Sequence, residues 1–345
     1  MASGTLTDVH IDGSMGEGGG QILRSSLALS TCLCKPFHIS NIRAARKKPG
    51  LQPQHLAAVK AATSISNAHV EGAEKDSLEL VFTPSKVIAG EYHFSIGTAG
   101  STSLVLQTIL PALILADAPS SLILEGGTHN PFAPPFDFLK YAFLPLLNQM
   151  GPTVTALLER PGFAPKGGGR VRVDIQPVNE LKPLELTERG EIQEQRAEVL
   201  LAHLPEHIAQ RELAVIKQEI GIGDNNLLFH FVNNAYGAGN VISAIIKSDY
   251  ITECFTAFGQ RGVPAEQVAG TVVKEVHRYL QAGVPVGRYL ADQLLLPLAM
   301  AGSGKFLTLK PSSHTLTNMN VISAFMDIQI QAEEVRFDVW QITLS

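Results

Sequence analysis

The apolar positions of the chain follow three similar arrangements, and each arrangement predicts a glycine turn, a helix and a strand. The segments begin at Gly16, Gly97 and Gly287 and read GEGGGQILRSSLALSTCLCKPFHIS, GTAGSTSLVLQTILPALILADAPSSLILEGGTHN and GRYLADQLLLPLAMAGSGKFLTLKPSSHTLTN. Apolar residues recur three and four positions apart in the helical parts, which is the spacing of an amphipathic helix. The second and third copies align best, because Gln107 and Gln293 each precede a proline by four residues.

Each copy continues with a second helix and further strands. Helical spacing recurs over residues 52–67, 133–150 and 318–326. Alternating strands are predicted at 77–84, 153–159, 169–177, 328–333 and 335–344. Each unit is therefore roughly βαβαββ. A sheet with one helical layer cannot bury the helices alone, so the sequence predicts an α/β (α+β) fold of three βαβαββ repeats packed around their helices.

An additional block of sequence separates the second copy from the third. It has a polar helical pattern over residues 196–221, strand patterns at 227–233, 240–248 and 251–259, and a second helix at 264–283. Glycine and proline mark both ends, as they do at sites where domains are inserted. We therefore predict a three-repeat catalytic core formed by residues 1–183 and 284–345, with an inserted α/β domain at 184–283.

Composition narrows the class of protein. Hydrophobic residues make up 45% and charged residues 17% of the 345 residues, which is ordinary for a globular protein. The longest apolar run, residues 104–116, contains Pro111 and reads as a buried helix, and the first residues carry no secretory signal pattern. The spacing of Cys32, Cys34 and Cys254 fits no disulfide or zinc framework. We expect reduced thiols, which fit a cytosolic or nuclear setting, and no membrane partner, and we predict a cytoplasmic location.

The first glycine turn, GSMGEGGGQILR, raises the question of a phosphate site. Glycine turns that open a helix often bind phosphate through backbone N–H groups. This turn lacks the lysine of a P-loop, and Gln21 stands where a dinucleotide fingerprint needs its third glycine. Glu17 would repel phosphate unless a cation lay between them. Two interpretations stay open here, a plain tight turn and a phosphate site bridged by a metal ion.

Charge is unevenly distributed along the chain. The net charge of −5 gives no global attraction to nucleic acid, yet Arg43, Arg46, Lys47 and Lys48 fall within six residues. Such a run is either a solvated loop or a patch that contacts phosphates. Repeat symmetry would bring the glycine turns and the following strand ends to one face. That face would collect Glu17, Arg24, Arg43, Arg46, Gln107, His129, Tyr289, Asp292, Gln293 and His314.

Several of these side chains have both a chemical and a structural interpretation. His314 lies in KPSSHTLTN, and a neutral imidazole is a competent nucleophile toward phosphorus, although a lone histidine is often structural. Asp292 could bind a cation, orient an imidazole or complement a helix dipole. Tyr289 could stack on a base or simply pack. Gln107 could meet a ligand or a backbone group, and Arg24 an anion or solvent.

The motifs together resemble one family. GEGGGQILR, IRAARKKPGLQPQH, GTAGSTSLVLQTILPAL, GGTHNPFAPPFDF, GRYLADQLLLPLAMAG and PSSHTLTN are similar to the RNA 3′-terminal phosphate cyclases, and they are spread over residues 11–320. The resemblance implies three repeats like the C-terminal domain of translation initiation factor three, plus one inserted α/β domain. It also implies an enzyme that uses ATP and Mg²⁺ (or Mn²⁺) to convert an RNA 3′-phosphate into a 2′,3′-cyclic phosphodiester.

The resemblance implies a role for individual residues. His314 would attack the α-phosphorus of ATP and become a histidinyl adenylate, which passes AMP to the RNA 3′-phosphate before the 2′-OH closes the ring. Glu17 would bind the metal ion, and Arg24, Arg43 and Arg46 would contact phosphates. The nucleotide contacts that the resemblance implies are Gln107, Pro134, Phe138, Tyr289, Leu290, Ala291, Asp292 and Gln293. The resemblance gives His129 no catalytic role.

Two other functions compete with the cyclase hypothesis. One is a non-catalytic relative that serves as a scaffold in ribosome assembly. Those relatives are said to lack the nucleophilic histidine, whereas His314 and the YLADQ segment are present in this chain. The other is an enolpyruvyl transferase, which shares the repeat architecture but needs neither an adenylate pocket nor a basic RNA patch.

Overall fold

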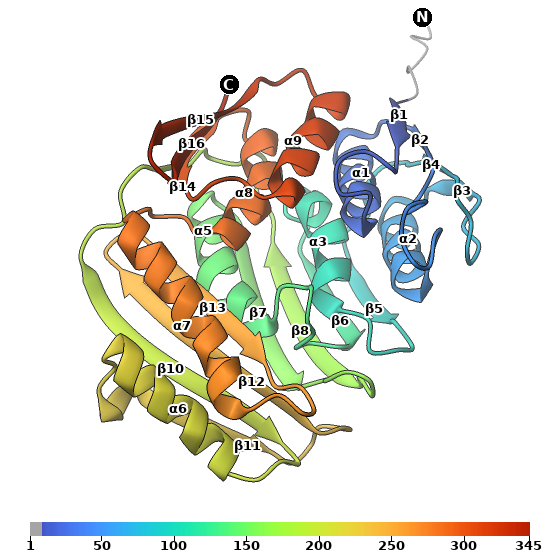
Figure 1. Ribbon diagram of the computed structural model, residues 1–345. Helices are drawn as coiled ribbons and strands as arrows, with labels where there is room; N and C mark the ends of the chain where they lie inside the picture. The colour runs from blue at the N-terminus through green and yellow to red at the C-terminus, as the bar shows by residue number, and fades with distance from the viewer. Residues whose placement is uncertain (1–8) are drawn as a thin grey trace, which may run out of the picture.

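One order of elements, β-α-β-α-β-β, recurs three times in the computed structural model, which describes residues 9–345 (Figure 1). In the first unit the strands hydrogen-bond in the order β1-β2-β4-β3. β1 and β2 run parallel, while β2–β4 and β3–β4 are antiparallel. The elements are β1 (Val9–Asp12), α1 (Gly20–Leu33), β2 (Phe37–Ser40), α2 (Pro53–Ser66), β3 (His69–Glu71) and β4 (Leu80–Thr83).

The second unit repeats this topology with longer strands. Its sheet order is β5-β6-β8-β7, with β5 parallel to β6 and the remaining pairs antiparallel. The second helix of the unit is built in three pieces, the middle one a wider π-helical turn. The elements are β5 (Glu91–Ser95), α3 (Thr102–Leu113), β6 (Ser120–Gly126), α4 (Phe136–Phe138), η1 (Leu139–Phe143), α5 (Leu144–Gln149), β7 (Thr153–Arg160) and β8 (Gly169–Gln176).

The third unit is interrupted in sequence. Its sheet order is β15-β16-β14-β9, and β9 is parallel to β14. β9 therefore serves as the first strand of the third unit, and the inserted segment follows that strand. The limits 184 and 283 of a separate domain stay a prediction. The elements are β9 (Glu185–Leu186), α8 (Arg288–Met300), β14 (Gly304–Thr308), α9 (Ser313–Phe325), β15 (Ile330–Arg336) and β16 (Val339–Leu344).

The inserted segment forms its own sheet, in the order β11-β10-β12-β13, and two helices cover it (Figure 1). The predicted helix at 196–221 is wrong in its first half, because residues 192–202 form a strand. Alternate residues Ala197, Val199 and Leu201 are buried there, so pairing with two neighbouring strands outweighs the helix propensity of this segment. The elements are β10 (Ile192–Ala202), α6 (His207–Ile220), β11 (Leu227–Val232), β12 (Gly239–Ser248), β13 (Thr252–Phe258) and α7 (Ala265–Ala282).

Helices of all three units meet in one hydrophobic core. α1 is central, since Ile22, Leu23, Leu27 and Leu29 have no exposed surface. The same core includes apolar residues of α2, α3, α8 and α9, and the sheets lie on its outside (Figure 1). The inserted segment has a second core between its sheet and α6 and α7. The predicted fold of three repeats packed around their helices is confirmed.

Two further expectations concern membrane-spanning segments and the state of the cysteines. No helix among residues 9–345 is long and apolar enough to cross a membrane. All three cysteines are free thiols. Desolvation raises the thiol pKa of buried Cys254 and of half-buried Cys32, the latter to about 12. Neither thiol is therefore a reactive thiolate at neutral pH.

A buried carboxyl connects the inserted sheet to α8. Glu253 of β13 is 2% exposed, and its Oε1 accepts a hydrogen bond of 2.5 Å from the backbone N–H of Gly287, immediately before α8. Burial raises the pKa of Glu253 to about 8. A Cβ on Gly287 would collide with the same carboxyl group, so this glycine is needed for the close approach.

We expect Glu253→Gln to flatten the decline of stability with rising pH. In the folded protein the carboxyl keeps its proton up to about pH 8, whereas its ordinary pKa is 4.5. Between these values the folded state binds more protons than the unfolded chain. The free energy of unfolding therefore falls as pH rises, by up to about 1.4 kcal/mol per pH unit for this group. Urea unfolding at several pH values measures the slope, with the exposed Glu333→Gln as control. Equal slopes in all three proteins would contradict the assignment.

Candidate functional site

The glycine turn between β1 and α1 is held against the first turn of α9. The backbone N–H of Glu17 donates to Thr317 Oγ1 at 3.2 Å, and that hydroxyl donates to the carbonyl of Ser313 at 2.7 Å. Gly16 has a φ of +53°, and a Cβ there would overlap Thr317 Oγ1. The turn thus needs a glycine for both its conformation and its packing. Elements almost 300 residues apart in sequence are joined at this point.

The carboxylate of Glu17 lies between a guanidinium and an imidazole. Glu17 Oε2 is 3.0 Å from Arg46 Nη2 and 3.0 Å from His314 Nε2. Arg46 also donates to the carbonyls of Glu17 and Gly18, at 2.8 and 3.3 Å. The Glu17 side chain is 10% exposed and that of His314 54%. The imidazole is therefore accessible while the carboxylate is shielded.

A hydrogen-bonded relay fixes the other side of the His314 ring. His314 Nδ1 is 2.6 Å from Gln21 Oε1, and Gln21 Nε2 donates to Asp292 Oδ1 at 2.7 Å. Because Gln21 gives its amide hydrogens to Asp292, its oxygen accepts and His314 Nδ1 must carry a hydrogen. A neutral ring would then have its lone pair on Nε2, whereas the 3.0 Å contact of Nε2 with Glu17 Oε2 requires a hydrogen between those two atoms. Burial raises the pKa of Asp292, while the hydrogen bond from Gln21 works in the opposite direction.

Asp292 is held by contacts from three helices. Asn318 Nδ2 of α9 donates to the Asp292 carbonyl at 3.3 Å, and Ser25 Oγ of α1 donates to Asn318 Oδ1 at 2.7 Å. Gln293 Nε2 donates to Asp292 Oδ2 at 3.3 Å. The relay therefore rests on the packing of α1, α8 and α9. Gln107 Nε2 of α3 donates to Gln293 Oε1 and brings the second unit into the network.

Positive charge gathers beside this relay. Burial lowers the pKa of Arg24 to about 10, and the charges of Glu17 and Asp292 act against that shift. Burial also lowers the pKa of Arg43, which donates to the carbonyls of Lys48 and Gly50 at 2.6 and 2.9 Å. Among residues 9–345, no carboxylate forms an ion pair with Arg24 or Arg43. Two unpaired, partly buried guanidinium groups can bind an anion.

His55 belongs to the same cluster and was absent from the sequence prediction. It is 8% exposed, and its pKa is lowered to about 3 by burial and by the charges of Arg24 and Arg43. Its Nδ1 accepts from the backbone N–H of Gln52 at 3.1 Å. The neutral ring therefore carries its hydrogen on Nε2, next to Gly20 and Arg24. The sequence signal that could have identified His55 was its position in the IRAARKKPGLQPQH motif.

The predicted nucleotide contacts differ in accessibility. Tyr289 is 57% exposed, with the guanidinium of Arg288 5.0 Å from its ring centre. The side chains of Phe138, Leu290 and Ala291 are in the main core. Only backbone atoms of the latter two residues can therefore meet a ligand without repacking. Pro134 is half-buried in the segment before α4.

His129 does not join this group, although repeat symmetry placed it there. Its Nε2 is 3.2 Å from Asp137 Oδ2, and its Nδ1 is 2.7 Å from Thr128 Oγ1. Burial acts to raise the pKa of Asp137, but the hydrogen bond and charge of His129 lower it. The prediction for His129 is thus wrong in location, because its ring is fully buried against Phe163 with a centroid separation of 5.5 Å.

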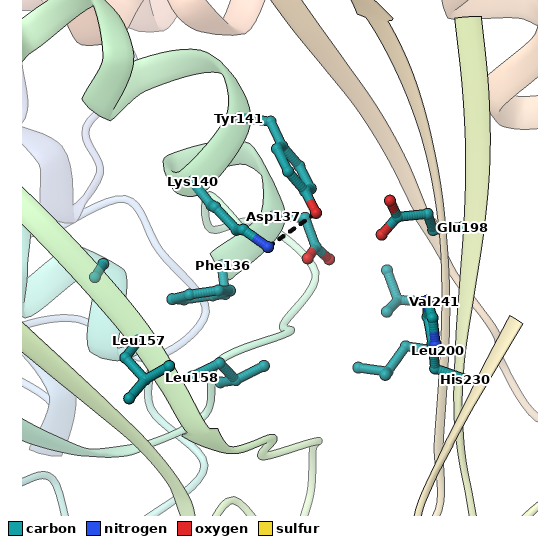
Figure 2. Close-up of a pocket in the computed structure, with 11 residues that line it drawn as sticks. Phe136, Asp137, Lys140, Tyr141, Leu157, Leu158, Glu198, Leu200, His230 and Val241 are labelled. Carbon is teal, nitrogen blue, oxygen red and sulfur yellow. Dashed lines mark hydrogen bonds between the residues drawn. The ribbon is translucent and has the colours of Figure 1, made fainter. Parts of the chain in front are cut away.

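A cavity of about 350 Å³ lies between α4, η1 and β7 on one side and the inserted sheet on the other (Figure 2). Asp137, Tyr141 and Glu198 form its polar end, and leucine side chains form the opposite end. None of the predicted site residues lines it. The cavity is therefore separate from the relay around His314, which lies on a more open surface.

The donor set fits one kind of metal ion. Residues 9–345 contain no group of three or more histidine, cysteine, aspartate or glutamate side chains that could hold an ion unaided. Mg²⁺ commonly uses one or two carboxylates together with water and substrate phosphates. Glu17 can supply one such carboxylate beside the arginine cluster, provided that Arg46 and His314 release it. The residues fit an ion that arrives with a nucleotide.

Comparison with known proteins places the chain in one family. A family model described as RNA 3′-terminal phosphate cyclase matches residues 15–332. The RNA 3′-terminal phosphate cyclase of Koribacter versatilis (strain Ellin345) is 47% identical over 329 residues, which cover 95% of this chain and 93% of the relative. The chain belongs to the RNA 3′-terminal phosphate cyclase family. It is therefore an enzyme of the cyclase class, as the sequence motifs predicted.

We expect Gly16→Ala to be destabilising by more than its conformation alone would require. A residue with a Cβ pays about 1–2 kcal/mol for a left-handed conformation. At Gly16 the overlap with Thr317 Oγ1 adds to this cost. The control is Gly302→Ala, since Gly302 has a φ of +78° and nothing within 4 Å of its Cβ position. Urea unfolding measures both. Equal losses would show that the contact with Thr317 is unimportant.

Proposed function

We propose that this enzyme uses ATP to convert an RNA 3′-terminal phosphate into a 2′,3′-cyclic phosphodiester through a covalent adenylate on His314. The observation that carries the proposal is the relay from His314 Nδ1 through Gln21 to Asp292. It leaves Nε2 as the nucleophilic nitrogen on an exposed ring. The three free thiols fit the reducing cytoplasm that we propose as its location.

The first step joins His314 to AMP. Nε2 attacks the α-phosphorus of ATP, a P–N bond forms, and the bond to the bridging oxygen of pyrophosphate breaks. The ring gains positive charge as the bond forms. Gln21 accepts the Nδ1 hydrogen and itself donates to Asp292, so the relay stabilises that charge. The contact between Nε2 and Glu17 is the resting arrangement. It opens before the attack, and the hydrogen between the two atoms passes to solvent, which leaves a lone pair on Nε2.

The later steps pass the adenylate to RNA. An oxygen of the RNA 3′-phosphate attacks the same phosphorus, the P–N bond breaks, and its electron pair returns to Nε2. The terminal 2′-oxygen then attacks the 3′-phosphorus, loses its proton to solvent or base, and expels AMP. Because the 2′-hydroxyl is held next to the activated phosphorus, this ring closure is intramolecular and has an effective molarity that can reach about 10⁵ M or more.

The cations and Glu17 hold the phosphates. We assign the unpaired guanidinium groups of Arg24 and Arg43, together with Arg46, to phosphate oxygens. Glu17 is the proposed ligand of a divalent ion, which would neutralise phosphate charge when bound. We assign Tyr289 and Pro134, with Phe138 close by, to the adenine. Gln107 and residues 290–293 provide the remaining nucleotide contacts.

A non-catalytic scaffold is the alternative function. A scaffold has no need of an imidazole that is oriented by a glutamine, itself held by a half-buried aspartate. The path from Asp292 through Gln21 to His314 therefore favours catalysis over assembly alone.

We expect wild-type protein incubated with ATP labelled at the α-phosphate and Mg²⁺ to keep acid-labile label on a denaturing gel. His314→Ala should keep none, because no other nucleophile replaces Nε2. His314 is half exposed, so its loss should leave the fold intact by circular dichroism.

The exposed His207→Ala serves as the matched control and should be labelled normally. An unlabelled wild-type protein would contradict the adenylate. Defined RNAs then test the acceptor. An end with a 3′-phosphate and a 2′-OH should be cyclised, whereas one that lacks the 2′-OH should stop at the RNA adenylate.

We expect Gln21→Ala to slow adenylation by at least about tenfold while the KM for ATP changes little. The substitution removes the acceptor for Nδ1–H and breaks the connection from the ring to Asp292, so the imidazolium charge loses its stabilisation. Single-turnover labelling over a range of ATP concentrations separates the two constants. A change confined to KM would show that Gln21 only binds ATP.

A further inference from the structure

Three loops meet around one buried aromatic ring, on the side of the second unit that faces the inserted sheet. Phe163 is 4% exposed and lies against the ring of His129. A Cβ on Gly239 would overlap the Phe163 ring, and Ala235 packs in the same small cluster. The ring thus holds together residues 129–135, 160–169 and 233–239, which we call the loop surface. The β7–β8 and β11–β12 turns lie together at the lower end of Figure 1.

Two aromatic side chains stand out from the loop surface. Tyr236 is 62% exposed, and its ring lies so close to Gly168 that a Cβ there would overlap it. The guanidinium carbon of Arg160 is 4.3 Å from the Tyr236 ring centre, and Arg160 Nε donates to the carbonyl of Gly168 at 2.5 Å. The tyrosine is therefore held in place with much of its ring accessible.

The second aromatic side chain is fully exposed. Phe132 has a relative exposure of 104% and a φ of +65°, an unfavourable conformation for any residue with a Cβ. Its loop is anchored by Asn130, which donates to the carbonyl of Ala99 at 2.5 Å. Neither packing nor backbone preference explains a phenylalanine here. An unfavourable backbone conformation that is kept in an anchored loop indicates a functional position.

The loop surface carries positive charge only. Its three segments contain Arg160 and Lys166 and no aspartate or glutamate. Outside these segments, the nearest acidic residues in sequence all have partners: Glu125 and Glu159 share the guanidinium of Arg170, at 2.8 and 2.6 Å, and Asp137 contacts buried His129 at 3.2 Å. A chain with a net charge of −5 therefore presents a local cationic face with two accessible aromatic rings.

We propose that the loop surface binds the single-stranded RNA immediately upstream of the reacting 3′ end, with bases stacked on Phe132 and Tyr236 and the backbone beside Lys166. Aromatic planes combined with cations are the means by which proteins hold unpaired nucleotides of any sequence. The inference rests on the proposed function, which assigns Pro134 to the adenine. Phe132 is two residues from Pro134, a span of at most about 7 Å. A strand leaving the adenylate therefore has this surface within reach.

Binding is measured with a fluorescent single-stranded RNA of about twelve nucleotides that ends in a 3′-phosphate, and with a 3′-phosphorylated dinucleotide. The variants are Phe132→Ala, Tyr236→Leu and Lys166→Ala. Tyr236→Leu keeps an apolar side chain over Gly168, so it preserves the loop packing. The matched controls are Phe337→Ala, at a residue that is 95% exposed, and Tyr250→Leu, at one that is 54% exposed.

We expect the two aromatic variants to bind the long RNA roughly tenfold more weakly, which is the usual scale of one lost base stack. Their affinity for the dinucleotide should not change, and the controls should match wild type on both ligands. Lys166→Ala should weaken binding of the long RNA and reduce its dependence on salt. Wild-type affinity for the long RNA in both aromatic variants would overturn the proposal, as would an equal loss on the dinucleotide.

Labelling with ATP alone separates this inference from the proposed function. Variants that still form the adenylate but bind long RNA weakly support the loop surface. If wild-type protein forms no adenylate, the proposed chemistry fails, yet the binding comparison still decides whether the loop surface holds RNA. Tight binding of double-stranded RNA in preference to the single strand would contradict base stacking and overturn the inference.

Discussion

The packing of α1 against α9 is the contact on which the candidate site depends. The glycine turn that carries Glu17 is attached to α9 through Thr317, and Ser25 of α1 reaches Asn318 of the same helix. These contacts bring a carboxylate from the start of the chain to an imidazole near its end. The hydrophobic core shared by the three units provides the force that holds the two helices together. A change in that core would therefore misalign the polar groups before it unfolded the chain.

The pKa shifts at the site arise because positively and negatively charged side chains are buried close together. Arg24 and Asp292 are each shifted toward neutrality by burial, and each acts to restore the charge of the other. His55 stays neutral beside the arginines. The two carboxylates, Glu17 and Asp292, are held by groups other than Arg24 and Arg43, so these two arginines keep free donors. The proposed phosphate site thus keeps cationic donors that its own acidic residues do not occupy.

The sequence predicted the repeats well because helix and strand periods are local properties. The error at residues 192–202 arose because Ala, Glu and Leu favour helices locally, and only pairing with β11 and β12 makes the segment a strand. Within the site, His314, Glu17 and Asp292 were predicted from motifs. Gln21 and His55 were missed as functional residues, since their roles depend on distances across 293 residues and on neighbouring charges. His129 shows the opposite error. Repeat symmetry placed it at the site, but equivalent positions in the repeats have different neighbours.

The pairing of β9 with β14 has a consequence for the order in which the chain can assemble. Residues 187–287 lie between the first strand of the third unit and its first helix. During synthesis on the ribosome, β9 emerges long before its sheet partner, whereas the inserted sheet can form at once from contiguous sequence. The third unit, which carries both Asp292 and His314, is therefore completed last. A chain interrupted before that point can have a folded insertion but lacks the complete candidate site.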